Sequence, residues 1–355
     1  MRRGFLSLSA RVVVNVEAMN MVEAIGNVVR HRKASVVYKL GGRYEVRTVP
    51  VISGEALRHA LQAALVDVAT SAGLPVCGWC RRYEFVKRGV VTDEFFGDLG
   101  GVESFRKVAS ANIYDAERLV MERCVVEDLG GFLIPTEPPV KRTSVFEVGF
   151  MVPVVVGDRV AYGFDVQFHV RHAPGAQAMV RRSREENQPQ SIYNVESSSA
   201  IYAVGVNVEL WRIGVASDGT SVGNRDARVK AALAALASVL NGDVRIGGHW
   251  SSYKPFWSLE SAVAVFSSPL PISAAPAVGE GYIEETVKLA KAKKEVYGRV
   301  VNDVDYRILA LGGGVQVEGG GGQGEVVEVV KEVPDFLKRL VEYGLEFGGV
   351  AGEEK

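Results

Sequence analysis

The sequence has few cysteines, almost no net charge and no long hydrophobic run. Its 355 residues include three cysteines, and 41 Lys and Arg nearly balance 42 Asp and Glu, which leaves a formal net charge of −1. Three cysteines are too few for a disulfide framework. Proteins that coat nucleic acid often carry excess positive charge, so the total argues against that role, although phosphate binding depends on local patches. Because the sequence has neither an apolar run of transmembrane length nor a signal peptide, we expect a cytoplasmic protein without membrane contact.

The sequence also lacks the common catalytic motifs. It contains no GxxxxGKS/T phosphate loop, no GxSxG nucleophile elbow and no His-x-x-x-His pair, and its carboxylates do not cluster as two-metal sites require. These absences predict a protein that is not an enzyme and that holds no cofactor and no catalytic metal. One alternative stays open. His249, with Tyr253 and Lys254 beside Gly247-Gly248, resembles the side-chain set of a metal-independent ribonuclease.

The cysteines leave three possibilities open. Cys77 and Cys80 form a CxxC pair, but a structural zinc site needs four ligands, and nothing in the spacing assigns Cys124 or a histidine to it. A disulfide is the second possibility. Plain thiols are the prediction we favour, because thiols of intracellular proteins are usually reduced.

The first 75 residues predict a strand, a hairpin and a helix. Apolar residues alternate with polar ones from Leu6 to Ala18, which indicates a strand with one buried face. Gly41-Gly42 between two apolar runs predicts a hairpin turn. Ser53 predicts a helix N-cap, and the helix is expected to end near Gly73. Residues 76–135 show no dominant period apart from a helix near 102–126, so we interpret them as an insertion.

The rest of the chain predicts further strands and helices. Gly157-Asp158 predicts a second hairpin, and strands are expected at 164–170, 200–210 and 260–267. A polar stretch, 173–191, separates the first two of these strands, and long loops of this kind are usually functional or disordered. Helices are predicted at about 225–240, 281–297 and 334–347, and a glycine-rich tip at 315–325. The pattern is that of an α+β protein.

Basic residues gather in connectors beside the predicted strands. The clusters are Arg30 to Lys33, Lys141-Arg142, Arg171-His172 and Arg181 to Arg184. Cations presented from loops suit phosphate contacts without base specificity, although each cluster taken alone is also consistent with solvated surface charge. Gly247-Gly248, followed by several aromatic residues, adds backbone N–H groups that can approach phosphates and rings that can stack on bases, or else fill the core.

Two segments resemble a known family. Residues 11–33, RVVVNVEAMNMVEAIGNVVRHRK, and residues 51–59, VISGEALRH, resemble the signatures of the archaeal Csa-two/DevR branch of the Cas-seven family, the type I-A Cascade backbone. The resemblance covers most of the chain, and its specific motifs lie in the first 60 residues.

The resemblance implies a fold and a function. The fold is a modified RRM-like (ferredoxin-type) antiparallel sheet with helical and β-hairpin insertions. The domains would be a palm of residues 1–75 and 195–350, a helical insertion of 76–140 and a thumb-like hairpin of 141–195, with the loop 171–192 at its tip. The function is non-catalytic binding of guide RNA (crRNA) by copies that form a helical filament and present the guide to target DNA. The implied partners include Cas-five-type, large and small subunits.

The clusters and the resemblance together give a set of candidate RNA contacts. RRM domains stack bases on aromatic residues of the central strands, but the polar face of the first strand has none, so contact with the RNA backbone is the expectation. The candidates are Asn15, Asn20, Arg30, His31, Arg32, Lys33, Ser53, Gly54, Arg58, Lys141, Arg142, Gln167, His169, Arg171, Met179, Arg181, Arg182, Gly247, Gly248 and Lys254.

Two alternative functions remain at this point. The ribonuclease that His249 suggests would process the guide. A DNA-binding autoregulator, which the name DevR implies, would need a DNA-reading element, and the sequence shows no helix-turn-helix signature.

Overall fold

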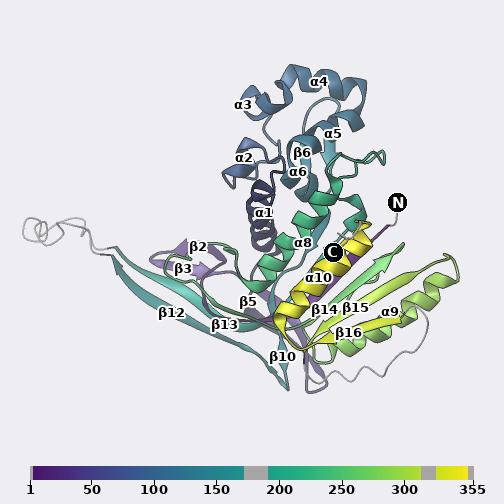
Figure 1. The fold of residues 1–355 in the computed structure, drawn as a ribbon. Helices are drawn as coiled ribbons and strands as arrows, with labels where there is room; N and C mark the ends of the chain where they lie inside the picture. The colour runs from purple at the N-terminus through teal and green to yellow at the C-terminus, as the bar shows by residue number, and fades with distance from the viewer. Residues whose placement is uncertain (1–2, 172–190, 313–324, 351–355) are drawn as a thin grey trace, which may run out of the picture.

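A large β-sheet organises the protein. The computed structural model describes residues 3–171, 191–312 and 325–350. Four antiparallel strands form the centre of the sheet in the order β12–β13–β1–β14, and β15 and β16 extend it beyond β14, with β16 parallel to β15 (Figure 1). Their bounds are β1 Phe5–Glu17, β12 Tyr162–Arg171, β13 Ser191–Val208, β14 Phe256–Ser268, β15 Asp305–Leu311 and β16 Glu325–Val330.

Helices cover both faces of this sheet. On one face lie α1 (Gly54–Ser71), α8 (Arg225–Asn241) and α10 (Val333–Gly348), and on the other lies α9 (Tyr282–Gly298) (Figure 1). The alternation of β1 places Leu8, Ala10 and Val12 in the larger core beneath the three helices. Val263 and Val265 of β14 point to the smaller core under α9. Among the described residues, no helix is both long and apolar enough to cross a membrane.

The polar face of β1 is buried at Ser7 and Ser9 and exposed only at Asn15, near the end of the strand, so the first part of this face does not lie along an RNA path. The hydroxyls of Ser7 and Ser9 accept hydrogen bonds from the backbone N–H groups of Ala274 and Ala277 at 2.9 and 3.0 Å. Arg11 donates to the carbonyl oxygens of Ala277 and Gly279. These polar side chains therefore bind the segment before α9, whose backbone groups need partners when buried.

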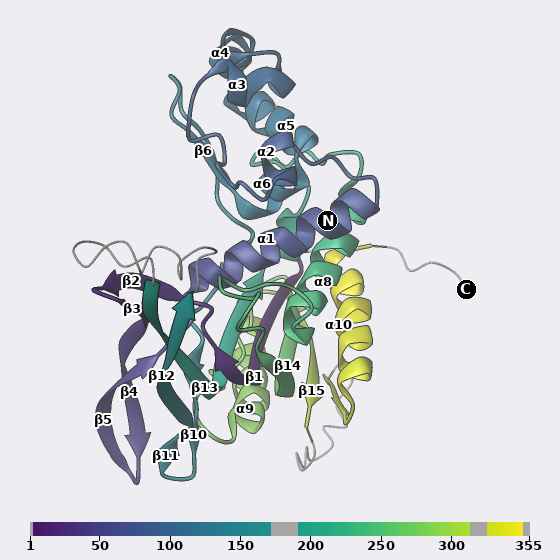
Figure 2. The ribbon, with the colours of Figure 1, turned by 90° about the vertical axis from the view of Figure 1, so that its left-hand side faces the viewer.

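The insertion is helical but more broken than expected. Instead of one helix near 102–126 there are three, because Asn112 and Cys124 adopt extended backbone conformations between them. Figure 2 shows the insertion beyond α1, away from the sheet. Its elements are α2 Gly78–Arg81, α3 Asp93–Phe96, η1 Gly97–Leu99, α4 Val102–Ala111, α5 Ile113–Arg123, α6 Val125–Gly130, β6 Phe132–Ile134 and β7 Val140–Arg142.

Short strands complete the fold. The predicted turns at 41–42 and 157–158 are confirmed, since they join β4 to β5 and β10 to β11 in antiparallel pairs. The basic stretch 30–33, expected to be a connector, instead forms the end of β3 and the start of β4. The bounds are β2 Met21–Ile25, β3 Val28–His31, β4 Lys33–Leu40, β5 Arg43–Pro50, β8 Phe146–Val148, β9 Val152–Pro153, β10 Val155–Val156, β11 Arg159–Val160 and η2 Leu210–Arg212.

Candidate nucleic-acid interface

A basic pocket lies where α1 begins. It has a volume of about 580 Å³. Its lining combines five separate parts of the chain: the β1–β2 connection, the β3–β4 connection, the start of α1, the segment after α2, and the loop before β14. We call this hollow the basic pocket; its lining residues are Asn20, Arg32, Ser53, Glu55, Ala56, Arg58, His59, Gln62, Phe85, Lys87 and Gly247.

The N-terminus of α1 is built as the sequence predicts. Ser53 is the N-cap, and its hydroxyl accepts a hydrogen bond from the N–H of Ala56 at 3.3 Å. The amide oxygen of Asn20 accepts from the N–H of Ser53 at 2.8 Å and so fixes the cap against the end of β1. Gly54 packs so closely on the carbonyl of Val148 that an added Cβ would come within 2.4 Å of its oxygen. The pocket therefore receives the positive end of the helix dipole, which favours anions.

Three cations line the basic pocket and face one carboxylate. Neither Arg32 nor Arg58 forms an ion pair within the described part of the chain, and the Nε atom of Arg32 is buried without a hydrogen-bond partner there. Burial, and to a lesser extent the charge of Arg58, lowers the pKa of Lys87 to about 8. Lys87 donates to the carbonyl of Gly130 at 2.9 Å, which holds the ammonium in place. With Glu55 as the single acidic residue of the lining, the pocket is positive and suits a phosphate.

Gly247 closes the pocket on the side of β14. Its φ angle is +70°, and a Cβ there would lie 1.8 Å from the carbonyl oxygen of Met19. The next residue, Gly248, donates its N–H to the same oxygen at 3.1 Å. The Gly-Gly pair therefore binds the turn after β1, and it lets the two backbones approach closely.

The basic cluster at 30–33 divides into two groups. Arg32 enters the basic pocket, whereas Arg30 and Lys33 form ion pairs with Glu196 at 4.0 and 3.4 Å. His31 is buried, with its Nε2 atom 2.6 Å from the carboxylate of Glu17. As a candidate RNA contact, His31 is therefore better explained as a structural residue.

The Glu17–His31 pair shifts both pKa values. Burial alone would lower the pKa of His31, but the hydrogen bond and the charge of Glu17 raise it above its ordinary value. Burial alone would raise the pKa of Glu17, yet the hydrogen bond and charge of His31, together with Ser198, lower it. The pair is thus a buried, charged contact between β1 and β3.

Arg142 is a correction to the candidate list. Its guanidinium is buried and donates to Asp128 and Glu117 at 2.6 and 2.9 Å. It also donates to three backbone carbonyls of the insertion and its surroundings. Since its donors are satisfied within the protein, Arg142 is not available to RNA, whereas its neighbour Lys141 is exposed.

Other candidates lie apart from the basic pocket. On β12, Gln167 donates to Asp165, and His169 hydrogen bonds the hydroxyl of Tyr253 and stacks on Tyr193. Asn15 is exposed near the end of β1. Lys254 lines a second hollow with Arg245. The side chain of Arg171, and all of Met179, Arg181 and Arg182, lie outside the described residues.

The residues that sequence reasoning missed are Lys87, His59, Gln62 and Phe85. His59 and Phe85 contact each other edge to face, with ring centroids 4.9 Å apart. Gln62 follows Arg58 by one helical turn, so helical spacing was a usable signal for it. Lys87 and Phe85 lie in the insertion, and their approach to α1 had no signal in the sequence.

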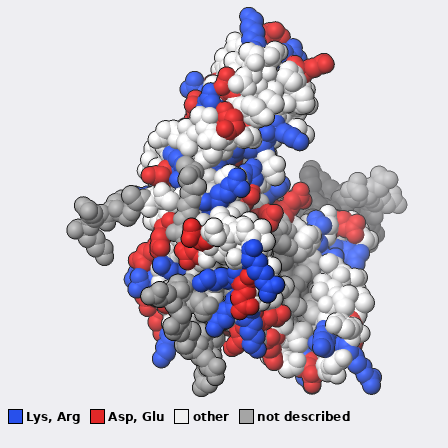
Figure 3. Space-filling view, turned by 90° about the vertical axis from the view of Figure 1, so that its right-hand side faces the viewer, with Lys and Arg blue, Asp and Glu red and all other residues white. Residues whose placement is uncertain are grey.

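The face on the side of α9 shows a different distribution of charge. In Figure 3, Lys and Arg are interspersed with Asp and Glu over that side of the molecule. Among the described residues, α9 itself carries both signs, with Glu284, Glu285 and Glu295 near Lys288 and Lys293. An interspersed surface gives a weak net field. The basic pocket is therefore the better candidate for an anionic ligand.

A family model and two relatives all place the chain in one family. The family model described as CRISPR-associated negative auto-regulator DevR/Csa2 matches residues 8–287. The chain belongs to the DevR/Csa2 family. It is 36% identical over 346 residues to the CRISPR-associated aCascade subunit Cas7/Csa2 2 of Saccharolobus solfataricus, with 95% of this chain and 99% of that protein covered. It is 32% identical over 300 residues to the CRISPR-associated protein Cas7/Csa2 1 of the same organism, with 84% and 89% covered.

A solved structure shares the fold of this DevR/Csa2 chain. A chain of a CRISPR RNA-guided surveillance complex, pre-nicking, superimposes with a TM-score of 0.51 at 13% sequence identity, and 96% of this chain and 100% of that chain are covered. At this identity the likeness concerns the fold alone. The family resemblance of residues 11–33 and 51–59 is thus confirmed, and both segments lie within the matched range.

Proposed function

We propose that the protein is a non-catalytic, guide-RNA-binding backbone subunit of a type I-A CRISPR interference complex. Copies of the chain would line up along the guide in a filament and present it to target DNA, together with Cas-five-type, large and small subunits in the cytoplasm. The family and the printed name of the Saccharolobus relative, an aCascade subunit, support this assignment. The observation that carries the RNA-binding part is the basic pocket.

The chemistry of the basic pocket suits an RNA phosphate. The N-terminus of α1 supplies N–H groups, and Arg32, Arg58 and Lys87 supply charge without a matching number of carboxylates. Phosphate contacts of this kind carry no sequence information, as a subunit that accepts every guide requires. The cost of keeping Arg32 partly buried without an ion pair is offset when a phosphate enters.

The core supports an RRM-like, ferredoxin-type palm. The order β12–β13–β1–β14 is antiparallel throughout, α1 follows β1, and α8 lies between β13 and β14 in the chain. In this proposal residues 1–75 and 195–350 form the palm, 76–140 the helical insertion, and 141–195 the thumb. The β12–β13 ribbon, which extends to one side in Figure 1, would be the part of the thumb that reaches toward a neighbouring copy.

A binding measurement tests the pocket. Fluorescence anisotropy with a labelled single-stranded RNA of guide length compares the natural chain with the Arg32→Ala/Arg58→Ala double variant. We expect a loss of affinity of at least about tenfold and a salt-dependence slope lower by about 1 to 2, since each cation contacts about one phosphate. The matched control, Lys288→Ala/Arg299→Ala, removes the same charge from exposed positions on α9 and at its C-cap, on the other face of the sheet.

The outcomes separate the pocket from general charge attraction. Equal losses in the two double variants would reduce RNA binding to a non-specific effect of net charge. Co-expression with a CRISPR array then tests the subunit role, because a backbone subunit should co-purify with guide-length RNA in an elongated particle. Incubation with repeat RNA in the absence of metal tests the ribonuclease alternative, in which His249 or the His169–Tyr253 pair would act.

A further inference from the structure

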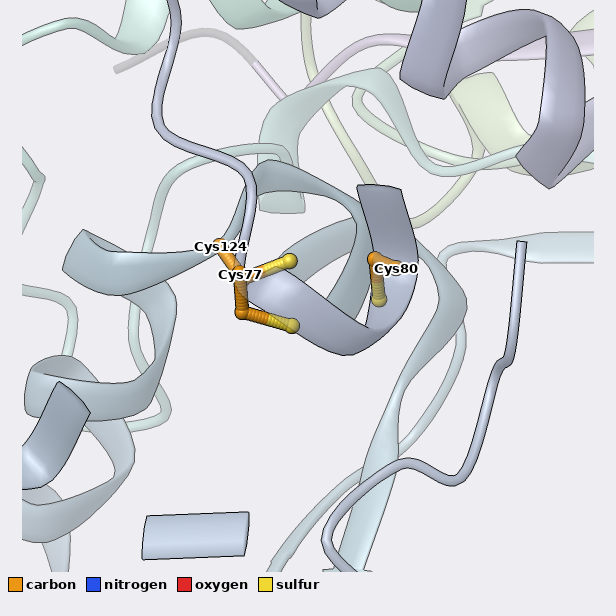
Figure 4. Close-up of side chains that lie close together, drawn as sticks. All are labelled: Cys77, Cys80 and Cys124. Atoms are coloured by element: carbon orange, nitrogen blue, oxygen red, sulfur yellow. The ribbon is translucent and has the colours of Figure 1, made fainter. Parts of the chain in front are cut away.

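Three cysteines that are distant in the sequence meet inside the helical insertion. Cys77 precedes α2, Cys80 lies within α2, and Cys124 lies between α5 and α6. Their sulfur atoms all lie within 4.8 Å of one another, and all three residues are buried (Figure 4). The chain has no other cysteine. All of its thiols are therefore gathered at one point, although 44 positions separate Cys80 from Cys124.

The separation of the sulfur atoms suits one metal ion. With Zn–S bonds of about 2.3 Å, the sulfur atoms of tetrahedral thiolate ligands lie about 3.8 Å apart. Small side-chain movements would therefore bring the three sulfur atoms to the distances that a zinc site requires. An iron–sulfur cluster would need wider spacing, because several iron atoms separate its ligands. A disulfide would use two of the thiols and leave the third without a role, and it would not require all three to approach one another.

The surroundings also favour bound thiolates. Arg88 and Lys87 interact electrostatically with Cys77 and Cys80 respectively. A divalent ion with three thiolates carries one negative charge, which the ammonium of Lys87 helps to offset, whereas Arg88 is also paired with Asp98 and Glu127.

We propose that Cys77, Cys80 and Cys124 bind a single zinc ion, with a small exogenous molecule in the fourth position. The ion ties the start of α2 to the junction of α5 and α6. The ion would stabilise the segment after α2, which has an unfavourable backbone conformation. In this segment Tyr83, Lys87 and Arg88 have positive φ angles of 62, 53 and 59°. Such conformations persist in residues other than glycine only where the surroundings hold them.

The first experiment measures metal in the natural full-length chain, without RNA. Protein produced with zinc in the medium and purified without chelator should contain about one zinc per chain by mass spectrometry. After exchange with Co²⁺, it should show the sulfur-to-cobalt charge-transfer band and the strong visible bands of a tetrahedral thiolate site. Thiol-reactive dye should label the three cysteines only after a chelator removes the metal.

Variants test the ligands. Cys80→Ser should lose the zinc and the thiolate band. Ala116→Ser, which also adds a hydroxyl at a fully buried position of the insertion, keeps all three thiols and should retain both. If Cys80→Ser fails to fold, the cobalt spectrum and the thiol labelling of the natural chain still decide the question.

Several outcomes overturn the proposal. They are three freely reactive thiols with no bound metal, a disulfide with one remaining thiol, and a cobalt spectrum without a thiolate band, which indicates adventitious binding elsewhere. None of these outcomes depends on RNA binding, so failure here leaves the proposed function standing, and failure of the RNA experiment leaves the metal site standing.

Discussion

Arg32 and Arg142 come from similar basic clusters in the sequence but have opposite surroundings in the structure. Arg142 is buried beside Asp128 and Glu117, and Asp128 also binds Arg228 at 2.8 Å. Arg32 lines the basic pocket, where its Nε atom has no partner among the described residues. Arg142 therefore stabilises the packing of the insertion, whereas Arg32 can still donate hydrogen bonds to a ligand.

The difference teaches how to interpret a basic cluster. A buried guanidinium needs carboxylates or carbonyls, and where the fold supplies them the charge serves stability. Where the fold supplies fewer carboxylates than cations, the excess charge can bind an anion. The count of nearby carboxylates in three dimensions, rather than the density of Lys and Arg in the sequence, therefore distinguishes the two regions.

Replacing Asp128 should have the largest effect, because it removes a carboxylate that neutralises the buried Arg142. Asp128→Ala leaves Arg142 and Arg228 buried without their carboxylate, and it also removes the acceptor for the N–H of Gly214. We expect the free energy of unfolding to fall by about 3 to 5 kcal/mol in urea denaturation. Asp218→Ala removes an exposed ion pair with Arg118 and should cost less than about 1 kcal/mol. Equal costs would contradict the distinction.

Adding a carboxylate to the basic pocket should make its charge resemble that around Arg142, where carboxylates neutralise the cations. Ala56 lies three residues after the N-cap Ser53, in the first turn of α1, where a negative charge is favourable. Ala56→Glu should keep the free energy of unfolding within about 1 kcal/mol of the natural value. It should lower RNA affinity about tenfold, because the new charge neutralises one cation. The uncharged control is Ala56→Gln, and equal weakening by both variants would point to steric blockage.

The pH dependence of RNA binding should depend on Lys87. Because its pKa is lowered to about 8, mainly by burial, its ammonium loses its proton as the pH rises through 8. We expect the affinity for RNA to fall severalfold between about pH 7 and 9, the loss of about one phosphate contact. Lys87→Arg stays protonated over this range and should show a flat profile. A natural chain with a flat profile would exclude Lys87 from the interface.

The smallest effect is expected from the Glu17–His31 pair. Because the pKa of His31 is raised, the protonated imidazole contributes its full stabilisation at pH values below the ordinary pKa of 6.5. That stabilisation is lost as the pH rises through the raised pKa. Because the pKa of Glu17 is lowered, its carboxylate contributes its full stabilisation above the ordinary value of 4.5. That stabilisation is lost as the pH falls through the lowered pKa. Urea denaturation from pH 5 to 9 should therefore show falling stability in the natural chain. His31→Gln should remove that slope, and an unchanged slope would assign it to other groups.

Much of the fold was predictable because its signals are local. The alternation of β1, the cap at Ser53 and the turns at Gly41-Gly42 and Gly157-Asp158 each depend on neighbouring residues, and the structure confirms them. The strands β15 and β16 were missed, since their flanking sequence is dominated by glycines. The burial of Ser7 and Ser9 was missed because their partners lie more than 260 positions away, as in the 267 positions between Ser7 and Ala274.

The candidate site was predicted in part for the same reason. Ser53, Gly54 and Arg58 were found from a helix start, and Asn20, Arg32 and Gly247 from short motifs, and these residues meet at the start of α1. Lys87 and Phe85 join them from the insertion, whose path back to α1 no local pattern encodes. Arg142 was included wrongly, because its carboxylate partners come from α5 and α6.

The sequence by itself determined the α+β class, the positions of the main helices and strands of the core, and the DevR/Csa2 family, because periodicity, caps and motifs act over a few residues. Only the tertiary structure decided which cations are neutralised and which remain for a ligand, and that Cys77, Cys80 and Cys124 converge. The physical reason is the same in each case. Electrostatic partners and metal ligands are set by distance in space, and segments far apart in the chain become neighbours only when the sheet and its helices pack together.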